Sequence, residues 1–210
     1  MILNNFSGIE TIRLHFIRHP FKEVENELGN IIVTSFNNQW QKDKIKLDFS
    51  KTLSYYDGKT SFHETVKCLI WQPQSIESDL VVFLSSMTDG WPTLLNKYFS
   101  LHKRETICAV LCDKQSKFPY YNFEYKSEDS DRIIQAMKDE FKWEFFENGP
   151  LLPFENELYY QKRKIEDRLN NDIINEYLQN NGIDISKDDF WKSKQMAVEF
   201  FTKLGSPCAL

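Results

Sequence analysis

Apolar and polar residues alternate in several short segments of the first third of the chain. Residues 12–16 (IRLHF) and 44–49 (KIKLDF) place an apolar residue at every second position. Successive side chains of a β-strand point to opposite faces of a sheet, so this alternation predicts strands with one buried face. Further strands are expected over residues 31–36 and 65–71, and Asp57-Gly58 is typical of a hairpin turn. These segments together predict an antiparallel sheet.

Two later segments are almost continuously apolar, namely LVVFL within residues 79–84 and ICAVL within residues 106–112. Strands of this kind are typical of the centre of a sheet that is covered on both faces. Between them, residues 92–102 have the spacing of an amphipathic helix, and Pro92 suits its first turn. The pattern predicts a strand-helix-strand unit within a mixed central sheet.

The next segments predict a turn at residues 113–117 and a strand at residues 121–125, where aromatic and polar residues alternate. Residues 129–140 are expected to form a short helix, because acidic side chains in a first turn oppose the positive end of the helix dipole. Alternation returns at residues 141–145, which predicts another strand with its aromatic side chains on one face.

The C-terminal part is expected to be helical. Apolar residues recur at four-residue intervals over residues 165–177, and Asn181-Gly182 is typical of a helix end. A last helix is predicted after Ser186, whose hydroxyl can cap it, and it ends at Gly205. Its apolar residues are Phe190, Ala197, Phe201 and Leu204.

These elements predict one α+β domain over residues 1–210. An antiparallel N-terminal sheet continues into a mixed central sheet, with flanking helices and two C-terminal helices. Two lobes are possible, residues 1–77 mostly β and residues 78–210 α/β with a helical tail. A chain of 210 residues suits a single core.

The composition narrows the class of protein. No apolar run approaches the roughly 20 residues that span a bilayer, and the first residues lack the pattern of a secretory signal. A cytoplasmic protein without a membrane segment is therefore expected. In such a compartment the four cysteines are expected to be free thiols. They are Cys68, Cys108, Cys112 and Cys208.

The charge balance bears on the partner. The chain has 26 basic and 31 acidic residues, a net charge of −5 and a pI near 5.5. A nonspecific nucleic-acid binder needs a positive field to replace the counterions around phosphates, so that class is not expected. An acidic protein favours encounter with a basic protein partner.

Six carboxylates lie among aromatic residues between residues 138 and 157 (KDEFKWEFFENGPLLPFENE). Paired acids can perform acid–base chemistry when burial separates their pKa values. No spacing here brings two of them together, and the strand predicted at residues 141–145 turns its acids away from the core. A solvated acidic face is therefore favoured over an active site.

Residues 85–89 (SSMTD) follow a buried strand and precede a helix, a place where α/β proteins often bind ligands. The segment is neither a phosphate-binding loop nor the nucleophile elbow of serine hydrolases. Helix capping by Asp89 or a neighbouring hydroxyl is favoured. A small hydrolase that uses the loop from Ser85 to Asp89 stays open as an alternative.

No motif predicts a metal or a cofactor. Cys108 and Cys112 lie on one face of one strand, about 13 Å apart at the rise of a strand, too far to share one zinc ion. His15 and His19 share the polar side of a strand without further ligands nearby. A catalytic Cys or Ser with a histidine base also stays open, since such groups meet only in the fold. His63 and His102 are the candidate bases.

Residues 139–184 carry a resemblance to a known class. It rests on KWEFFENG at residues 142–149, on Pro153-Phe154-Glu155, on Tyr160, and on residues 163–168 leading into a helix. The segment resembles the C-terminal part of bacterial cytosolic proteins, some of them immunity proteins of contact-dependent and other polymorphic toxin systems. The resemblance implies a non-catalytic toxin inhibitor that binds its cognate toxin tightly, often a nuclease.

The leading functional hypothesis is therefore an immunity protein, not an enzyme, that neutralises a cognate basic toxin by direct binding. Such affinity rests on a few buried anchors and on facing charges of opposite sign. A self-associating structural or regulatory subunit is a further alternative. The predicted partner-binding residues are Trp91, Glu144, Glu147, Asp188, Asp189 and Trp191.

Overall fold

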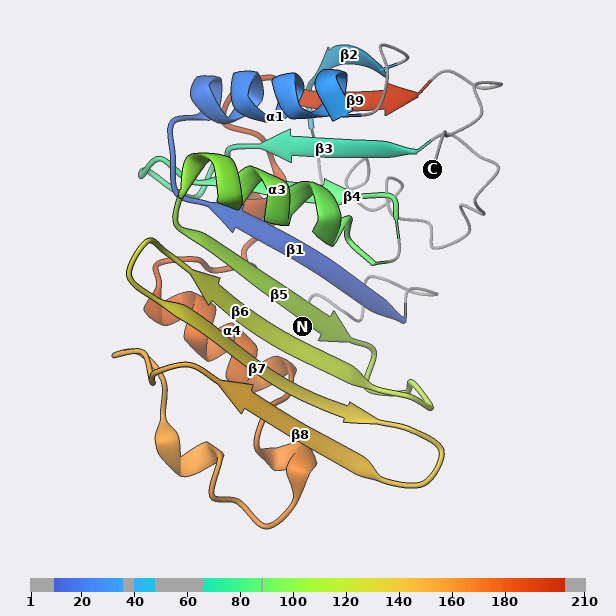
Figure 1. Cartoon of the computed structure of the whole chain (residues 1–210), viewed down its shortest axis with the longest axis vertical. Coiled ribbons are helices and arrows are strands. Elements are labelled where there is room, and N and C mark those ends of the chain that lie inside the picture. The colour runs from blue at the N-terminus through green and yellow to red at the C-terminus, as the bar shows by residue number, and fades with distance from the viewer. Residues whose placement is uncertain (1–9, 36–39, 48–65, 88, 203–210) are drawn as a thin grey trace.

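The computed structural model of the chain describes residues 10–35, 40–47, 66–87 and 89–202 (Figure 1). In this part of the chain an α+β fold is confirmed, with nine strands and three α-helices. The helices are α1 (Phe21–Ser35), α3 (Pro92–His102) and α4 (Asn171–Asn180). The strands are β1 (Thr11–Ile17), β2 (Trp40–Ile45), β3 (Lys67–Trp71), β4 (Val81–Ser85), β5 (Thr106–Cys112), β6 (Tyr120–Lys126), β7 (Asp131–Lys138), β8 (Trp143–Asn148) and β9 (Ala197–Thr202).

All nine strands form one sheet in the order β2-β9-β3-β4-β1-β5-β6-β7-β8. Every pairing is antiparallel, so the prediction of a mixed sheet is wrong. The strand-helix-strand unit of β4, α3 and β5 does exist, but β1 lies between its two strands. Since both β4 and β5 pair with β1 in the antiparallel sense, they run parallel to each other without being neighbours.

The two faces of the sheet are covered differently (Figure 1). Helices α1 and α3 lie over β9, β3, β4 and β1, and we call their side of the sheet the α1/α3 face. Helix α4 and residues 183–191 after it cover the opposite face, which we call the α4 face. The larger core cluster lies on this face. No described helix covers the α1/α3 face of β7 and β8, and α3 reaches only one end of β6, at Glu124 and Lys126. This half of the sheet is therefore covered on one face only.

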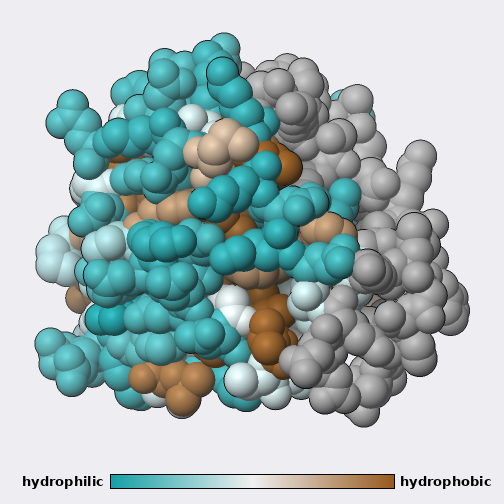
Figure 2. Space-filling model, turned by 90° about the horizontal axis from the view of Figure 1, so that it is seen from above, coloured by the Kyte–Doolittle hydropathy of each residue, from teal (hydrophilic) through white to brown (hydrophobic). Residues whose placement is uncertain are grey.

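Figure 2 shows the end of the molecule that carries α1 and β2. Outside the parts drawn in grey this surface is mainly hydrophilic, with only small apolar areas. The exposed apolar side chains that matter below lie on the far strands β7 and β8 instead.

The strand predicted at residues 31–36 is wrong, because residues 31–35 belong to α1. This helix buries Phe21, Val24, Leu28 and Ile32 at intervals of three and four residues, the spacing of one helix face. The apolar run near its end resembles a strand only when it is considered without the preceding turns.

The helix predicted at residues 129–140 is also wrong, because Asp131–Lys138 forms β7. Alternate residues Arg132, Ile134 and Ala136 are buried, and the strand pairs with β6 on one side and β8 on the other. Two ladders of backbone hydrogen bonds outweigh the weak helix preference of the segment.

The C-terminal prediction is half correct. Helix α4 begins at Asn171, where the side chain of Asn170 accepts hydrogen bonds from the helix start, and the chain turns at Gly182, whose φ is 75°. The predicted last helix is wrong, because its residues form a short 3₁₀ helix (Asp188–Trp191) and then β9. Strand β9 fills the position between β2 and β3, where its backbone pairs on both sides.

The remaining predicted strands overlap β1, β3, β4, β5, β6 and β8, with shifted ends, and the helix at residues 92–102 is confirmed. The strand predicted at residues 44–49 shares only residues 44 and 45 with β2, since residues 46–47 are not in a strand and residues 48–49 lie outside the described residues. The hairpin turn predicted at Asp57-Gly58 lies outside the described residues. The single sheet takes strands from both of the lobes considered above. None of the described helices has the length and apolarity that crossing a membrane requires.

Candidate functional site

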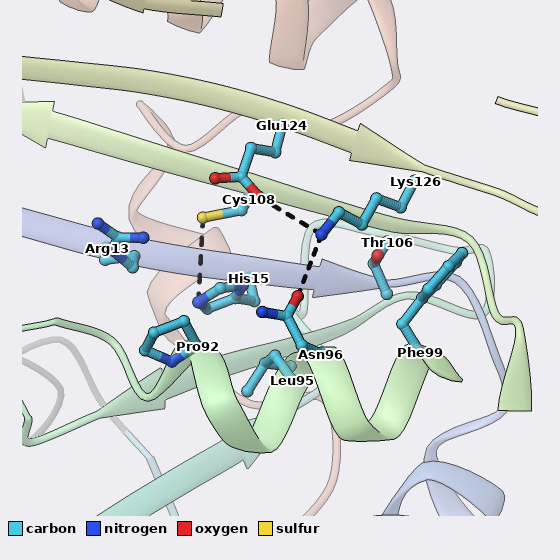
Figure 3. A pocket seen from close by; sticks show the side chains of 10 residues that line it. All are labelled: Arg13, His15, Pro92, Leu95, Asn96, Phe99, Thr106, Cys108, Glu124 and Lys126. Carbon is cyan, nitrogen blue, oxygen red and sulfur yellow. Dashed lines mark hydrogen bonds and ion pairs between the residues drawn. The ribbon is translucent and has the colours of Figure 1, made fainter. Parts of the chain in front are cut away.

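A polar cavity of about 90 Å³ lies between α3 and the strands β1, β5 and β6, at the border of the uncovered half of the sheet (Figure 3). The helix contributes mainly apolar side chains and one amide, while the strands contribute charged and polar ones. The lining residues are Arg13, His15, Pro92, Leu95, Asn96, Phe99, Thr106, Cys108, Glu124 and Lys126. The cavity is thus apolar on its helix wall and charged on its sheet wall.

His15 and Cys108 form the floor of this cavity. They are direct cross-strand partners in the register of β1 and β5, and 3.9 Å separates His15 Nε2 from Cys108 Sγ. Glu124 continues the same row on β6, opposite Cys108. Asn122 lies beside this row, with its Nδ2 3.0 Å from Glu124 Oε1 and 4.0 Å from Cys108 Sγ. Strand pairing therefore joins residues that are more than 90 positions apart.

Burial keeps the thiol and the imidazole uncharged. Desolvation, followed by repulsion from Arg13, lowers the pKa of His15 to about 3. Desolvation and the nearby Glu124 raise the pKa of Cys108 to about 12. A nucleophilic cysteine acts as a thiolate, which an adjacent imidazolium normally stabilises. At neutral pH this pair carries neither charge, so it lacks the state that thiol catalysis requires.

Two cations complete the sheet wall. Lys126 Nζ donates to Asn96 Oδ1 at 3.1 Å and lies 3.9 Å from Glu124. Arg13 Nε and Asn122 Oδ1 are buried without a hydrogen-bond partner within the protein. A polar cavity of this size can hold ordered water, which occupies about 30 Å³ per molecule in the liquid. The cavity is therefore polar enough and large enough to hold water.

The side chains of Ser85, Ser86 and Asp89 accept backbone hydrogen bonds, but the predicted capping of α3 by Asp89 is wrong, because the N-cap residue is Trp91 and it has no side-chain cap hydrogen bond. Ser85 Oγ accepts from Met87 N, Ser86 Oγ accepts from Lys67 N, and Asp89 Oδ1 accepts from Trp91 N just before α3 begins. Both serines are buried, at 1% and 4% exposed. Their hydroxyl oxygens hold backbone groups rather than face an open cleft.

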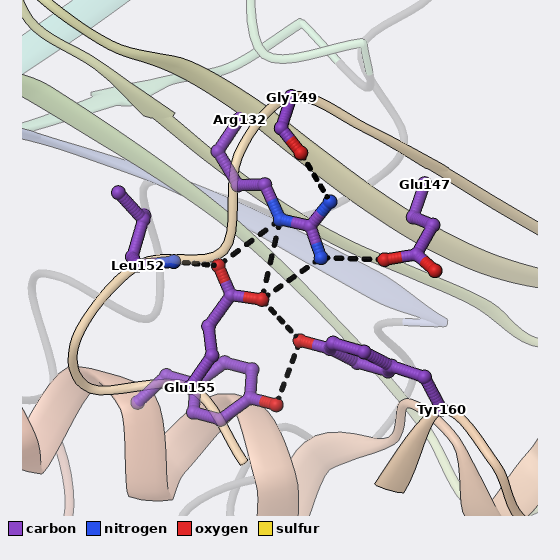
Figure 4. Close-up of polar contacts among 7 residues, drawn as sticks. Arg132, Glu147, Gly149, Leu152, Glu155 and Tyr160 are labelled. Carbon is purple, nitrogen blue, oxygen red and sulfur yellow. Dashed lines mark hydrogen bonds and ion pairs between the residues drawn. The ribbon is translucent and has the colours of Figure 1, made fainter. Parts of the chain in front are cut away.

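A second polar cluster is buried on the α4 face (Figure 4). The guanidinium of Arg132 contacts Glu155 at 2.9–3.2 Å and Glu147 Oε2 at 2.6 Å, and it donates to the carbonyl of Gly149. The side chains of Arg132 and Glu155 are 2% and 0% exposed. Burial alone would lower the pKa of Arg132, but its bonds to Glu155 and Glu147 outweigh this and raise it.

Tyrosine hydroxyls close the cluster. Tyr160 donates to Glu155 Oε2 at 2.6 Å and lies 2.8 Å from the hydroxyl of Tyr177 on α4 (Figure 4). Burial and the Glu155 carboxylate raise the pKa of Tyr160. Of the acids between residues 138 and 157, Glu155 is thus an internal ion-pair partner, while Glu144 is partly exposed and pairs with Lys142. Sequence reasoning missed Glu155 because its partner Arg132 was assigned to a helix.

The predicted partner-binding residues do not converge on one surface. Glu144 and Glu147 lie on β8, and Glu147 is held by Arg132. Asp188 and Asp189 are exposed in a separate 3₁₀ helix. The carbonyl of Asp189 accepts backbone hydrogen bonds from Gln74 and Ser75, which follow β3. The structure therefore separates the acidic residues into two groups.

The two tryptophans predicted as anchors are buried. Trp91 is 5% exposed and stacks on Trp40, and Trp191 is 1% exposed and donates to the carbonyl of Ile185. Neither ring is presented at the surface of this structure. Large aromatic side chains contribute most when buried, and here the core provides that burial within the chain itself.

The histidines also lie apart from the predicted arrangement. His63 is outside the described residues, while His102 lies at the end of α3 beside Glu27 rather than beside a nucleophile. His19 does not share the strand face of His15, because the strand ends at Ile17.

Searches against protein-family models, curated proteins and solved structures find no match for this chain.

Proposed function

We propose that this protein is an immunity protein that binds a basic protein toxin directly, through the uncovered side of β6, β7 and β8. The interaction surface, which we call the open face, lies on the α1/α3 face of these strands. It comprises Tyr120, Gln135, Met137, Glu144 and Phe146. The observation that carries the proposal is that exposed apolar side chains and an excess of acidic charge coincide at this end of the sheet.

The apolar part of the open face follows from the register. Met137 lies opposite Tyr120 on one side and Glu144 on the other, and Gln135 lies opposite Phe146. Directly opposed residues point to the same side of a sheet, so these five side chains are neighbours. Phe146 is 53% exposed and Met137 is 41% exposed. Aromatic and methionine side chains are enriched at protein interfaces.

The segment that forms this end of the sheet is acidic, counted over both of its faces and its hairpins. Residues 124–148 contain eight acidic and four basic side chains, a net charge of −4 out of −5 for the whole chain. A surface of this sign accelerates encounter with a basic partner and selects against acidic ones. A basic nuclease toxin has the complementary charge.

The shape of β8 also favours a protein partner. A depression of about 470 Å³ runs along β8 and around its edge, lined by Met137, Glu144 and Phe146 on the open face and by Phe145 and Arg168 on the other side. In the described part of the chain β8 pairs only with β7, so its outer backbone edge can accept a strand. Addition of a partner strand to a free sheet edge is a recurrent mode of protein recognition. A second copy of the chain could use the same edge, which keeps self-association as the alternative.

The geometry gives less support to the hydrolase alternative. The loop at residues 85–89 uses its side-chain oxygens for backbone hydrogen bonds, and the nearest thiol–imidazole pair is uncharged. A nucleophile activated by a base, which hydrolysis of this type requires, is not formed by these groups.

The proposal is tested by capture and protection together. Tagged protein is incubated with lysate of its own cell, washed at high salt, and the retained proteins are identified by mass spectrometry. Each retained protein is then expressed alone and with the tagged chain, and cell growth is recorded. Phe146→Ser and Glu144→Lys alter the open face. Leu158→Ser is the matched control, because Leu158 is 67% exposed in a 3₁₀ helix elsewhere on the chain.

The expected result is a basic protein that arrests growth alone, is tolerated with the wild-type chain and with Leu158→Ser, and arrests growth with the open-face variants. Retention of a toxic protein by all variants alike would assign binding to another surface. Absence of any growth-arresting partner would overturn the immunity function. A mass that doubles with concentration and returns to that of the monomer in Phe146→Ser would support self-association instead.

A further inference from the structure

Two histidines and two glutamates converge where the start of α1 meets the end of α3. His19 precedes α1, and Glu23 and Glu27 follow at four-residue intervals on that helix. His102 belongs to the last turn of α3. We propose that His19, Glu23, Glu27 and His102 bind one divalent transition-metal cation, for which zinc fits best. The site is independent of the open face and of the function proposed for it.

The distances that join Glu27 to both histidines, and His19 to Glu23, suit a tetrahedral ion. Four ligands about 2.0 Å from zinc lie about 3.3 Å from one another. Glu27 Oε1 is 3.4 Å from His102 Nδ1 and 3.9 Å from His19 Nε2, and His19 Nε2 is 2.7 Å from Glu23 Oε2. These values bracket the required spacing. The ligand atoms of His19, Glu23 and Glu27 all lie within 4.8 Å of one another, and His102 joins this group through its contact with Glu27.

The donor types define the class of cation. Two imidazole nitrogens with two carboxylate oxygens favour zinc and related first-row ions, since hard ions such as magnesium prefer oxygen ligands alone. Histidine and carboxylate ligands together form many zinc centres. Because the imidazoles come from different elements, a bound ion would also connect α1 to α3.

A hydrogen bond outside the ligand set orients the central carboxylate. Tyr98 on α3 donates from its hydroxyl to Glu27 Oε2 at 2.6 Å, which leaves Oε1 directed toward both histidines. The side chain of Glu27 is only 14% exposed. Metal-binding carboxylates are commonly held by such second hydrogen bonds. Glu27 is therefore fixed in position before an ion arrives.

Arg104 provides the competing positive charge. Its Nη2 lies 2.7 Å from Glu27 Oε1 and 4.0 Å from Glu23 Oε2. The side chain is 33% exposed, so the guanidinium can swing toward solvent when an ion takes its place. Removal of this arginine should therefore strengthen metal binding, whereas it would weaken a cluster that is only an ion-pair network.

The test is a titration of chelator-treated whole protein with zinc chloride, followed by calorimetry, with magnesium chloride as the comparison ion. Cobalt chloride reports the ligand geometry through its visible absorption bands. Glu23→Gln and His102→Asn each remove one ligand, and circular dichroism checks their folding. Glu166→Gln is the matched control, because Glu166 lies in an exposed ion pair with Lys164.

We expect one zinc ion per chain, tetrahedral cobalt bands and no response to magnesium. Glu23→Gln and His102→Asn should lower the zinc affinity by at least about tenfold, Arg104→Gln should raise it severalfold, and Glu166→Gln should leave it unchanged. Zinc binding that is equally strong in folded Glu23→Gln and His102→Asn would place the ion elsewhere and overturn the proposal. No zinc binding, or weaker binding by Arg104→Gln, would overturn it as well.

Discussion

His15 on β1 and Cys108 on β5 are directly opposed, with 3.9 Å between the imidazole Nε2 and the thiol Sγ. The pair has the composition of a catalytic dyad but the electrostatics of a packed core. His15 is 7% exposed, its ring lies edge-on to Phe83, and its environment favours the neutral form. Two consequences of this burial can be measured.

The first consequence is a pH dependence of stability. His15 has a folded-state pKa of about 3, below its ordinary value near 6.5, so the unfolded chain binds one more proton between these values. The free energy of unfolding should therefore be constant with respect to this group above pH 6.5. It should fall by up to about 1.4 kcal/mol per pH unit toward pH 3.

Chemical denaturation of the wild type and His15→Gln across this pH range measures that contribution. The variant should show a shallower fall, by up to the same slope, because it has no imidazole to protonate. An NMR titration in which the His15 ring protonates near pH 6.5 in the folded protein would contradict the expectation.

The second consequence concerns thiol reactivity. Burial raises the pKa values of Cys68 and Cys108, which are 0% and 5% exposed. Iodoacetamide at pH 8 should therefore label both residues only as fast as the protein unfolds, because the thiolate is the reactive form. Peptide mass spectrometry with and without denaturant measures the rates. Rapid labelling of folded Cys108 that His15→Gln abolishes would instead support a catalytic cysteine with a histidine base.

The Arg132–Glu155 pair predicts a large stability effect. Arg132→Leu leaves Glu155 buried without its cation, which should cost about 3–5 kcal/mol of unfolding free energy. The double variant Arg132→Leu with Glu155→Leu should be more stable than Arg132→Leu, because no buried unpaired charge remains; Glu147 also loses its partner, but its side chain is 40% exposed and can be hydrated. Lys142→Ala is the control, since it removes an exposed pair with Glu144 and should cost at most about 1 kcal/mol. If Arg132→Leu and Lys142→Ala lower the free energy of unfolding equally, burial of the Arg132–Glu155 pair does not add to its importance.

The glycine next to the cavity predicts a position-specific effect. Gly90 has φ of 74°, and an added Cβ would lie 2.1 Å from Arg13 Cδ, whereas Gly182 has φ of 75° and open space around it. Gly182→Ala should cost about 1–2 kcal/mol for the left-handed backbone alone. Gly90→Ala should cost clearly more, and the excess should shrink when combined with Arg13→Ala. Thermal and denaturant unfolding of the four variants provide the comparison. If both substitutions lower the free energy of unfolding equally, the Arg13 side chain can move away from the added Cβ without cost.

Continuous apolar runs predicted the buried central strands, and periodicity predicted the helix at residues 92–102, which has enough turns to define a face. Periodicity failed over residues 31–36, 129–140 and 197–202. Short apolar runs there suit a helix or a strand equally, and their neighbours decide. Strand β9 exists because the sheet offers it pairing partners from β2 and β3, which are distant in sequence.

The candidate sites likewise differ in how much of them local sequence can predict. The spacing of His19, Glu23 and Glu27 is visible in the sequence, but the strand assigned within residues 31–36 concealed the helix that aligns them. The pairing of His15 with Cys108, by contrast, has no local signal. It follows from a register that joins β1 to β5.

By itself the sequence determined the α+β class, the acidic charge and the buried central strands, since composition and short periodicity depend on neighbouring residues alone. The tertiary structure alone decided the all-antiparallel order, the burial of Trp91 and Trp191, and the internal role of Glu155. These features depend on which distant segments share the sheet and which faces the helices cover. Long-range pairing sets both, because a backbone edge or an apolar face is satisfied by whichever part of the chain reaches it.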